Sequence, residues 1–273
     1  PDRYDGFHTY NRCCRSKEDT GRHADNLKSY TKDRRAYENW SDGNIQAANN
    51  FMGSKFFKGI SADHIGPISL GFIHDSRFLQ PMVSGDNSSK RDRLLKDDFI
   101  KLIELEKKHK ILPVSWFARI IWETMKSEEN IDLEHYRIIL KNNINNFMHL
   151  LFLLLENTKL QGKTFLEHFY LDPKKEFFKY KYKFNHDGTF TFSERNMTDS
   201  TRKEYSRFFK IAFESIYDYN DKENRNTKTS SLKAVTYKLQ ELYKLINNEP
   251  TNIQNKILFK EIVETLQKQL LDK

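Results

Sequence analysis

The sequence predicts an α+β fold in which a small strand–strand–helix module is embedded in a mainly α-helical body. Glycines and prolines punctuate two short β-prone runs, at 60–65 and 77–83. From residue 94 onward, apolar residues recur at spacings of three and four, the period of an amphipathic helix. Aromatic and basic residues alternate on both sides of His186-Asp187-Gly188, which predicts one additional β-hairpin near 177–194.

The first fifty residues are rich in Asn, Asp, Arg and Tyr and poor in aliphatic residues. They predict loops and one short helix at 45–52, capped by the polar run Ser41-Asp42-Gly43-Asn44. Apolar spacing then predicts a helix at 94–110. Further helices are expected at 115–127, 133–157, 163–169, 199–219, 231–247 and 251–271.

The charge and hydropathy of the chain are those of a soluble, basic protein. The 273 residues include 46 Lys plus Arg against 38 Asp plus Glu, a net charge of +8. Mean hydropathy is -0.79, and the longest apolar run, at 147–155, is far shorter than the roughly 20 residues of a membrane span. We therefore expect a soluble protein without a membrane partner, and the basic balance weakly favours a polyanion partner such as nucleic acid.

The two cysteines, Cys13 and Cys14, are adjacent, so they predict neither a disulfide framework nor a metal site and fit a reducing cytoplasm. The chain begins Pro1-Asp2 without methionine. Removal of an initial methionine explains this start, and so does a position as the C-terminal portion of a longer protein.

The chemistry-bearing residues lie between 63 and 93. An Asp63-His64 pair ends the first predicted strand, and Asn87 precedes Lys90 where a helix follows the second. Carboxylate and amide oxygens suit Mg²⁺, which keeps several coordination positions for water and phosphate. A neutral histidine beside the metal can deprotonate water at cellular pH. The pattern therefore predicts a one-metal nuclease site with Asp63 and Asn87 as ligands and His64 as general base.

These residues resemble the HNH, or ββα-metal, nuclease motif. The matching positions are Asp63, His64, Ile65, Pro67, Leu79, Gln80, Asn87 and Lys90. Phe78 replaces the middle asparagine that braces the hairpin in the family, so the bracing must come from elsewhere. Val83 and Asp86 stand where structural zinc cysteines would lie, and we expect no structural zinc.

The runs at 10–19 and 33–38, with this motif and a long helical tail, resemble the cleavage half of BsaI-type type IIS restriction endonucleases. The resemblance implies one Mg²⁺ per active site, a double-stranded DNA substrate, and cleavage outside an asymmetric site recognised by an N-terminal part. One site cuts one strand at a time, so a double-strand break requires a second copy or two sequential events. We interpret 1–110 as the nuclease region, with its core at 41–110, and 111–273 as a mainly helical region.

Basic residues around the motif are candidate DNA contacts. Lys90, Arg91 and Arg93 open the helix after Asn87, where they could reach a phosphate, Lys90 assisting at the scissile one. Arg34 and Arg35 belong to an earlier basic cluster that is interrupted by aspartates. A solvated helix end and a solvated loop face are the alternatives. The lysines at 179, 181 and 183 likewise fit either a DNA contact or protection of an edge strand.

Two alternatives to the type IIS hypothesis stay open. One is another HNH enzyme, such as a homing or modification-dependent endonuclease. The other is a non-catalytic DNA-binding module with a decayed nuclease motif, an alternative that the replacement of the middle asparagine by Phe78 leaves open.

Overall fold

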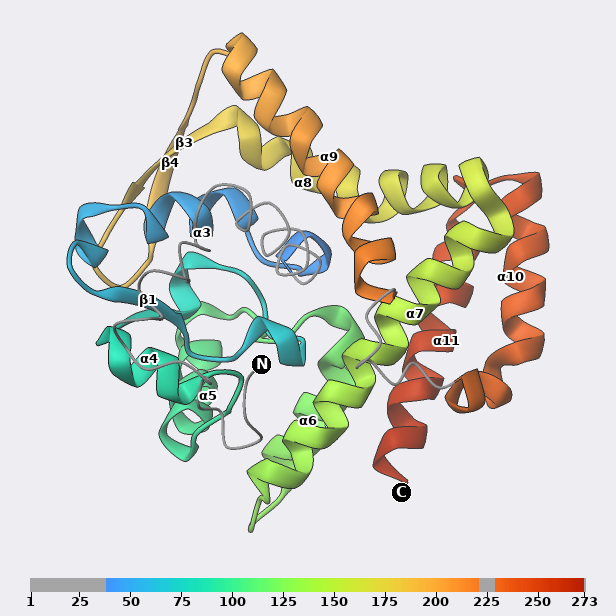
Figure 1. Ribbon diagram of the computed structural model, residues 1–273, viewed down its shortest axis with the longest axis horizontal. Helices are drawn as coiled ribbons and strands as arrows, with labels where there is room; N and C mark the ends of the chain where they lie inside the picture. Colours follow the sequence, from blue (N-terminus) through green and yellow to red (C-terminus); the bar gives the residue numbers. More distant parts are fainter. Residues whose placement is uncertain (1–37, 221–228, 273) are drawn as a thin grey trace, which may run out of the picture.

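The computed structural model describes residues 38–220 and 229–272, and it has the predicted α+β character. Helices dominate, and the described strands form two separate two-stranded antiparallel sheets (Figure 1). The α-helices are α3 (Ile45–Met52), α4 (Ser84–Lys90), α5 (Lys96–His109), α6 (Arg119–Ser127), α7 (Leu133–Leu166), α8 (Asp172–Lys175), α9 (Asp199–Asn220), α10 (Thr236–Asn248) and α11 (Ile253–Leu271). The strands are β1 (Ser61–His64), β2 (Leu79–Met82), β3 (Tyr180–Phe184) and β4 (Phe190–Glu194).

The predicted strand–strand–helix arrangement is present in the N-terminal half. Asn44 caps α3, because its side chain accepts a hydrogen bond from the Ala47 backbone. Strands β1 and β2 pair antiparallel with Asp63 opposite Gln80, and α4 follows β2 directly. The helix expected at 94–110 is α5, which starts two residues late and ends where Lys110 adopts a left-handed conformation with φ of 55°.

The central helical stretch α7 contains the break that the sequence predicted. Separate helices were expected at 133–157 and 163–169, and Lys159, between them, has non-helical backbone angles, with φ of 48° and ψ of -119°, so α7 is two helical segments joined at a kink. The helical stretch Leu133–Lys179 is long and apolar enough to cross a membrane by length and composition alone. However, 56% of its most apolar window is buried inside the protein, as in the core helix of a globular domain.

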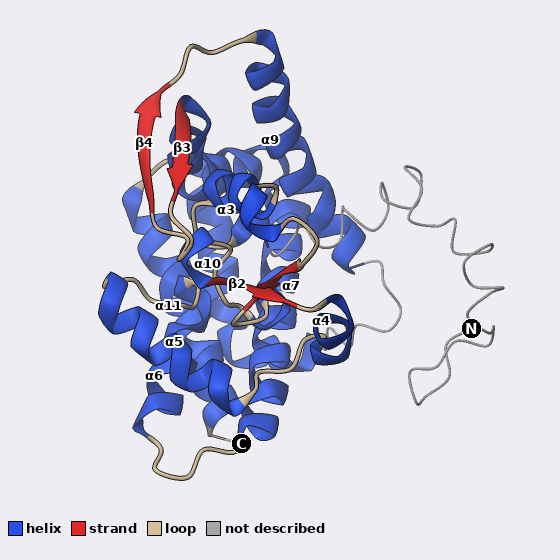
Figure 2. Cartoon of the chain, turned by 90° about the vertical axis from the view of Figure 1, so that its left-hand side faces the viewer, coloured by secondary structure: helices blue, strands red, loops and turns tan. Residues whose placement is uncertain are grey.

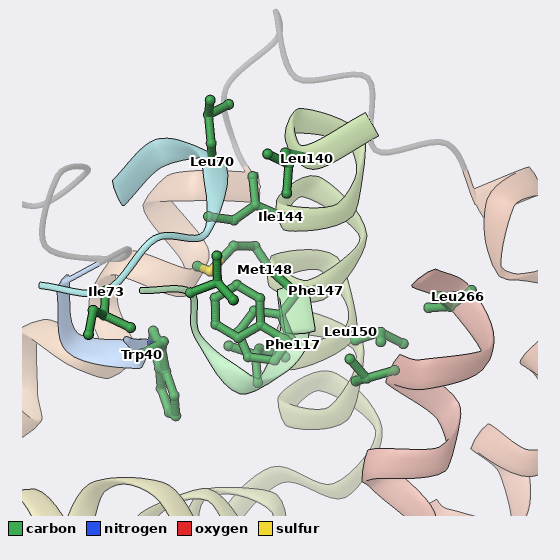
Figure 3. Close-up of a cluster of buried hydrophobic side chains, with 14 of the residues drawn as sticks. Trp40, Leu70, Ile73, Phe117, Leu140, Ile144, Phe147, Met148, Leu150 and Leu266 are labelled. Carbon is green, nitrogen blue, oxygen red and sulfur yellow. The ribbon is translucent and has the colours of Figure 1, made fainter. Parts of the chain in front are cut away.

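The larger of two clusters of buried hydrophobic residues joins the N-terminal module to the helical body. Figure 3 shows Trp40, Leu70 and Ile73 beside side chains of α7, with Leu266 of α11 nearby. The rings of Phe117 and Phe147 stack at the centre with centroids 3.9 Å apart. This larger cluster thus crosses the boundary proposed near residue 110, and the module packs directly against α7.

The second hairpin matches the prediction in position and in the alternation of its faces. In β3 the tyrosines and Phe184 are half-buried, whereas Lys181 and Lys183 are exposed. Its turn packs on the 3-10 helix η4 (Ser76–Phe78), which leads into β2. The Ser76 hydroxyl donates to the Gly188 carbonyl at 2.7 Å, and Lys108 pairs with Asp187 at 3.0 Å. Figure 2 shows the paired strands β3 and β4 at the upper left, with β2 and α4 lower and to the right.

We expect Gly188→Ala to detach this turn from η4. Gly188 has φ of +76°, and a Cβ there would lie 2.0 Å from the Ser76 carbonyl oxygen. The clash involves two backbones, so the predicted loss is about 1–3 kcal/mol in the free energy of unfolding, measured by urea denaturation. Gly85→Ala is the matched control, since a Cβ at Gly85 meets nothing within 4 Å. Equal stability of the two variants would contradict the docking.

Candidate functional site

His64 ends β1, as predicted, and its half-buried ring is part of a chain of side-chain contacts. The ring nitrogen Nε2 of His64 lies 2.7 Å from Nδ1 of His74, a hydrogen-bonding distance. The two ring centroids are 5.0 Å apart, with planes inclined by 40°. His64 is therefore held by another side chain through one nitrogen rather than projecting alone.

His74 is a site residue that sequence reasoning missed, because the histidines other than His64 lack partners at catalytic spacing in the sequence. It lies in the loop between η3 (Ile68–Leu70) and η4, with none of its surface exposed. Its backbone N–H donates to the Ser41 hydroxyl at 2.7 Å. Its Nε2 lies 3.2 Å from Oδ1 of Asn49 on α3. A tertiary contact, not a motif, brings His74 to His64.

Asp63 is buried next to His64, and Lys90 reaches it from the C-terminal end of α4. The Lys90 ammonium donates to Asp63 Oδ2 at 2.6 Å and to the carbonyls of His64 and Ile65 at 2.9 and 3.1 Å. It also pairs with Asp98 Oδ2 at 3.0 Å. Only 2% of the Lys90 side chain is exposed. This placement argues against the predicted phosphate contact and gives Lys90 the role of a buried counter-ion for two carboxylates.

Gln80 bridges the same two carboxylates from β2. Its amide nitrogen donates to Asp63 Oδ2 at 2.9 Å and to Asp98 Oδ1 at 3.2 Å. Its amide oxygen accepts from Lys101 at 2.8 Å, which fixes the amide orientation. Gln80 was expected from the motif, whereas Asp98, on α5, was not. Together these contacts hold the Asp63 carboxylate in one orientation.

The amide of Asn87 is half-buried on α4. Asn87 lies one turn before Lys90 on α4, and residues three apart are neighbours on a helix surface. Within 38–220 and 229–272, no hydrogen bond to Asp63 Oδ1 is formed, and no group of three or more His, Cys, Asp or Glu side chains could hold a metal ion. The proposed ligands, the Asp63 carboxylate and the Asn87 amide, are fewer than three and include an amide, so they are not a group of that kind. They nevertheless suit Mg²⁺, which takes few protein ligands and keeps several waters.

Of the four arginines predicted to contact DNA, Arg91 and Arg93 lie at the end of α4. Arg91 is exposed, and Arg93 donates from Nε to the Lys90 carbonyl at 3.2 Å and from Nη2 to the Ser89 carbonyl, so it caps the end of α4. Both arginines line a hollow of about 580 Å³ that also includes Arg137. Arg34 and Arg35 lie outside the described residues.

The entry to β2 is braced by Asp75, three residues before Phe78. Phe78 itself is buried in the core at 2% exposure. Asp75 accepts two hydrogen bonds from the Arg77 guanidinium, at 2.7 and 2.8 Å, and one from the Asn44 backbone. Burial raises the pKa of the Asp75 carboxyl, but these hydrogen bonds and the Arg77 charge outweigh that effect and hold the pKa below its usual range. Asp75 is therefore an ionised anchor for the entry to β2.

Comparison with known proteins gives one family. The model of a type II restriction endonuclease family (RE_Alw26IDE) matches residues 1–272, almost the whole chain. No curated protein and no solved structure matches the chain. The match covers both the strand–strand–helix module and the helical body.

Proposed function

Because the chain belongs to the RE_Alw26IDE family of type II restriction endonucleases, we propose that its nuclease site is of the HNH, or ββα-metal, type. The family implies an enzyme that acts on DNA in restriction. The proposed reaction is Mg²⁺-dependent hydrolysis of phosphodiester bonds in double-stranded DNA. The proposed site comprises Asp63 and His64 on β1 and Asn87 on α4.

The placement of α4 against β1 is the observation that carries this proposal. The Lys90 ammonium ties α4 to the end of β1 through two backbone carbonyls and the Asp63 carboxylate. Because Asn87 is one turn before Lys90, the proposal puts its amide on the side of α4 toward the strand that bears His64. A residue pair on a strand and an amide on the following helix thus share one small module, which the one-metal hypothesis requires.

In this proposal His64 accepts the proton of the attacking water. Asp63 Oδ1 and the Asn87 amide oxygen would hold the Mg²⁺, since Asp63 Oδ2 is engaged by Lys90 and Gln80. When bound, the ion stabilises negative charge on the leaving oxygen. Arg91, which lines the hollow next to α4, would contact the DNA backbone.

The type IIS character is part of the proposal. Cleavage at a fixed offset from an asymmetric site would be directed by a recognition part separate from the core of the nuclease region at 41–110. A double-strand break would then need a second copy of the chain or two sequential cuts. Mapping of cut ends distinguishes this behaviour from that of a homing or modification-dependent endonuclease.

Asn87→Ala tests the metal assignment. Loss of one of two protein ligands should raise the Mg²⁺ concentration for half-maximal cleavage by more than about tenfold. Asn87→Asp, which keeps an oxygen ligand, should retain cleavage at moderate Mg²⁺. Plasmid nicking measured across a Mg²⁺ titration gives both values.

Ser88→Ala is the matched control for this titration, because Ser88 is an exposed neighbour on α4. An unchanged Mg²⁺ requirement in Asn87→Ala would exclude Asn87 as a ligand. Salt-dependent DNA binding by the wild-type chain without cleavage at any Mg²⁺ concentration would favour the non-catalytic module instead.

A further inference from the structure

We propose that His74 and Asn49 are positioning residues that fix the tautomer and orientation of His64. The inference rests on the proposed nuclease function and adds a side-chain relay from α3, a helix outside the strand–strand–helix module. The relay consists of Asn49, His74 and His64, joined by contacts of 3.2 and 2.7 Å. The relay residues reach the site from three separate segments of the chain.

The direction of the hydrogen bonds follows from the acceptor at the end of the relay. Oδ1 of Asn49 has only lone pairs, so Nε2 of His74 must carry the proton. In a neutral imidazole the other nitrogen is then an acceptor, and Nδ1 of His74 accepts from Nε2 of His64. His64 is consequently the Nε2–H tautomer, and its Nδ1 is the basic nitrogen that can take a proton from water.

The relay can act in this way because His74 is clamped from both sides of its backbone. Its N–H is bound by the Ser41 hydroxyl at 2.7 Å. A Cβ at Gly43 would lie 2.2 Å from the His74 carbonyl oxygen, so the 41–43 loop lies directly on this residue. With the ring fully buried and its Nε2 bound by Asn49, His74 offers His64 a fixed acceptor. A fixed partner orients a catalytic imidazole before the substrate binds.

Substitution of Asn49 tests the relay with little risk to folding, since Asn49 is exposed on α3. Asn49→Leu removes the acceptor and should lower kcat for DNA cleavage by about 10–100-fold with a smaller change in KM. Asn49→Asp restores an acceptor oxygen and should recover kcat to within about threefold of wild type. Asn50→Leu, an exposed neighbour with the same change of side chain, is the control and should leave kcat unchanged. Equal kcat for wild type and Asn49→Leu would overturn the proposal.

A second measurement tests whether the relay fixes the His64 tautomer, even if the chain does not cleave DNA. In long-range ¹H–¹⁵N spectra of the neutral, histidine-labelled protein, the His64 signals should show a protonated Nε2 and an unprotonated Nδ1 in the wild type and Asn50→Leu. The Asn49→Leu spectrum should show a mixture of tautomers. A predominant Nδ1–H form in the wild type, or an unchanged Nε2–H form in Asn49→Leu, would contradict the relay. A correct tautomer pattern without cleavage would instead place the failure in the proposed function.

Discussion

Replacement of His64 with alanine is expected to lower the rate of DNA cleavage by about 10²–10⁴-fold, the usual contribution of a general base. The loss should be in kcat rather than in DNA affinity, because the proposed DNA contacts lie on α4 and around the adjacent hollow. The same change also frees His74 from its contact with His64. Single-turnover cleavage and filter binding, measured on the same preparation, separate the two effects.

His135→Ala is the matched control for this experiment. His135 is exposed on α7, and its substitution should leave both cleavage and binding unchanged. Thermal unfolding of the two variants checks that neither loses the fold. Cleavage by His64→Ala at the wild-type rate would remove His64 from the mechanism.

Replacement of Lys90 with methionine should lower the free energy of unfolding by about 3–5 kcal/mol. Methionine keeps most of the apolar stem, but the buried carboxylates of Asp63 and Asp98 then lose their ammonium partner at 2.6 and 3.0 Å. Gln80 offers each carboxylate only one N–H contact. Urea denaturation measures the change, and a phosphate-contact role for Lys90 would instead leave stability nearly unchanged.

A double variant identifies the cause of this loss. Lys90→Met with Asp98→Asn removes one of the two uncompensated charges and should recover a measurable part of the stability, a coupling expected between contacting residues. Arg91→Met is the surface control and should change stability by no more than about 0.5 kcal/mol. If Lys90→Met were as mild as Arg91→Met, the buried ion-pair cluster would not exist as described.

Local patterns were sufficient for much of the fold. The bounds of α3 match the capped apolar run at 45–52, and β1 and β2 fall inside the two punctuated runs at 60–65 and 77–83. The hairpin at 180–194 follows from alternation and a His-Asp-Gly turn. The interruption of the apolar pattern between 157 and 163 likewise predicted the break of α7 at Lys159, although helical backbone resumes closer to the break than expected.

The site was predictable only where its residues belong to one motif. Asp63, His64 and Asn87 follow from spacing, because they lie on two adjacent elements of the strand–strand–helix module. The burial of Lys90 depends on its ion pair with Asp98 of the next helix, and the spacing of these residues in the sequence does not predict that contact. His74 sits in a loop whose position is fixed by packing of 41–43 and α3. Such tertiary contacts override what charge and local sequence suggest.

Plasmid cleavage tests most directly whether this chain hydrolyses DNA with Mg²⁺ and with His64 as general base. The purified chain and its His64→Ala variant would each be incubated with Mg²⁺ or with EDTA, and the cut ends would be mapped. Nicked and linear products are expected only when Mg²⁺ and His64 are both present. Products that form in EDTA, or that form equally well with His64→Ala, would contradict this expectation.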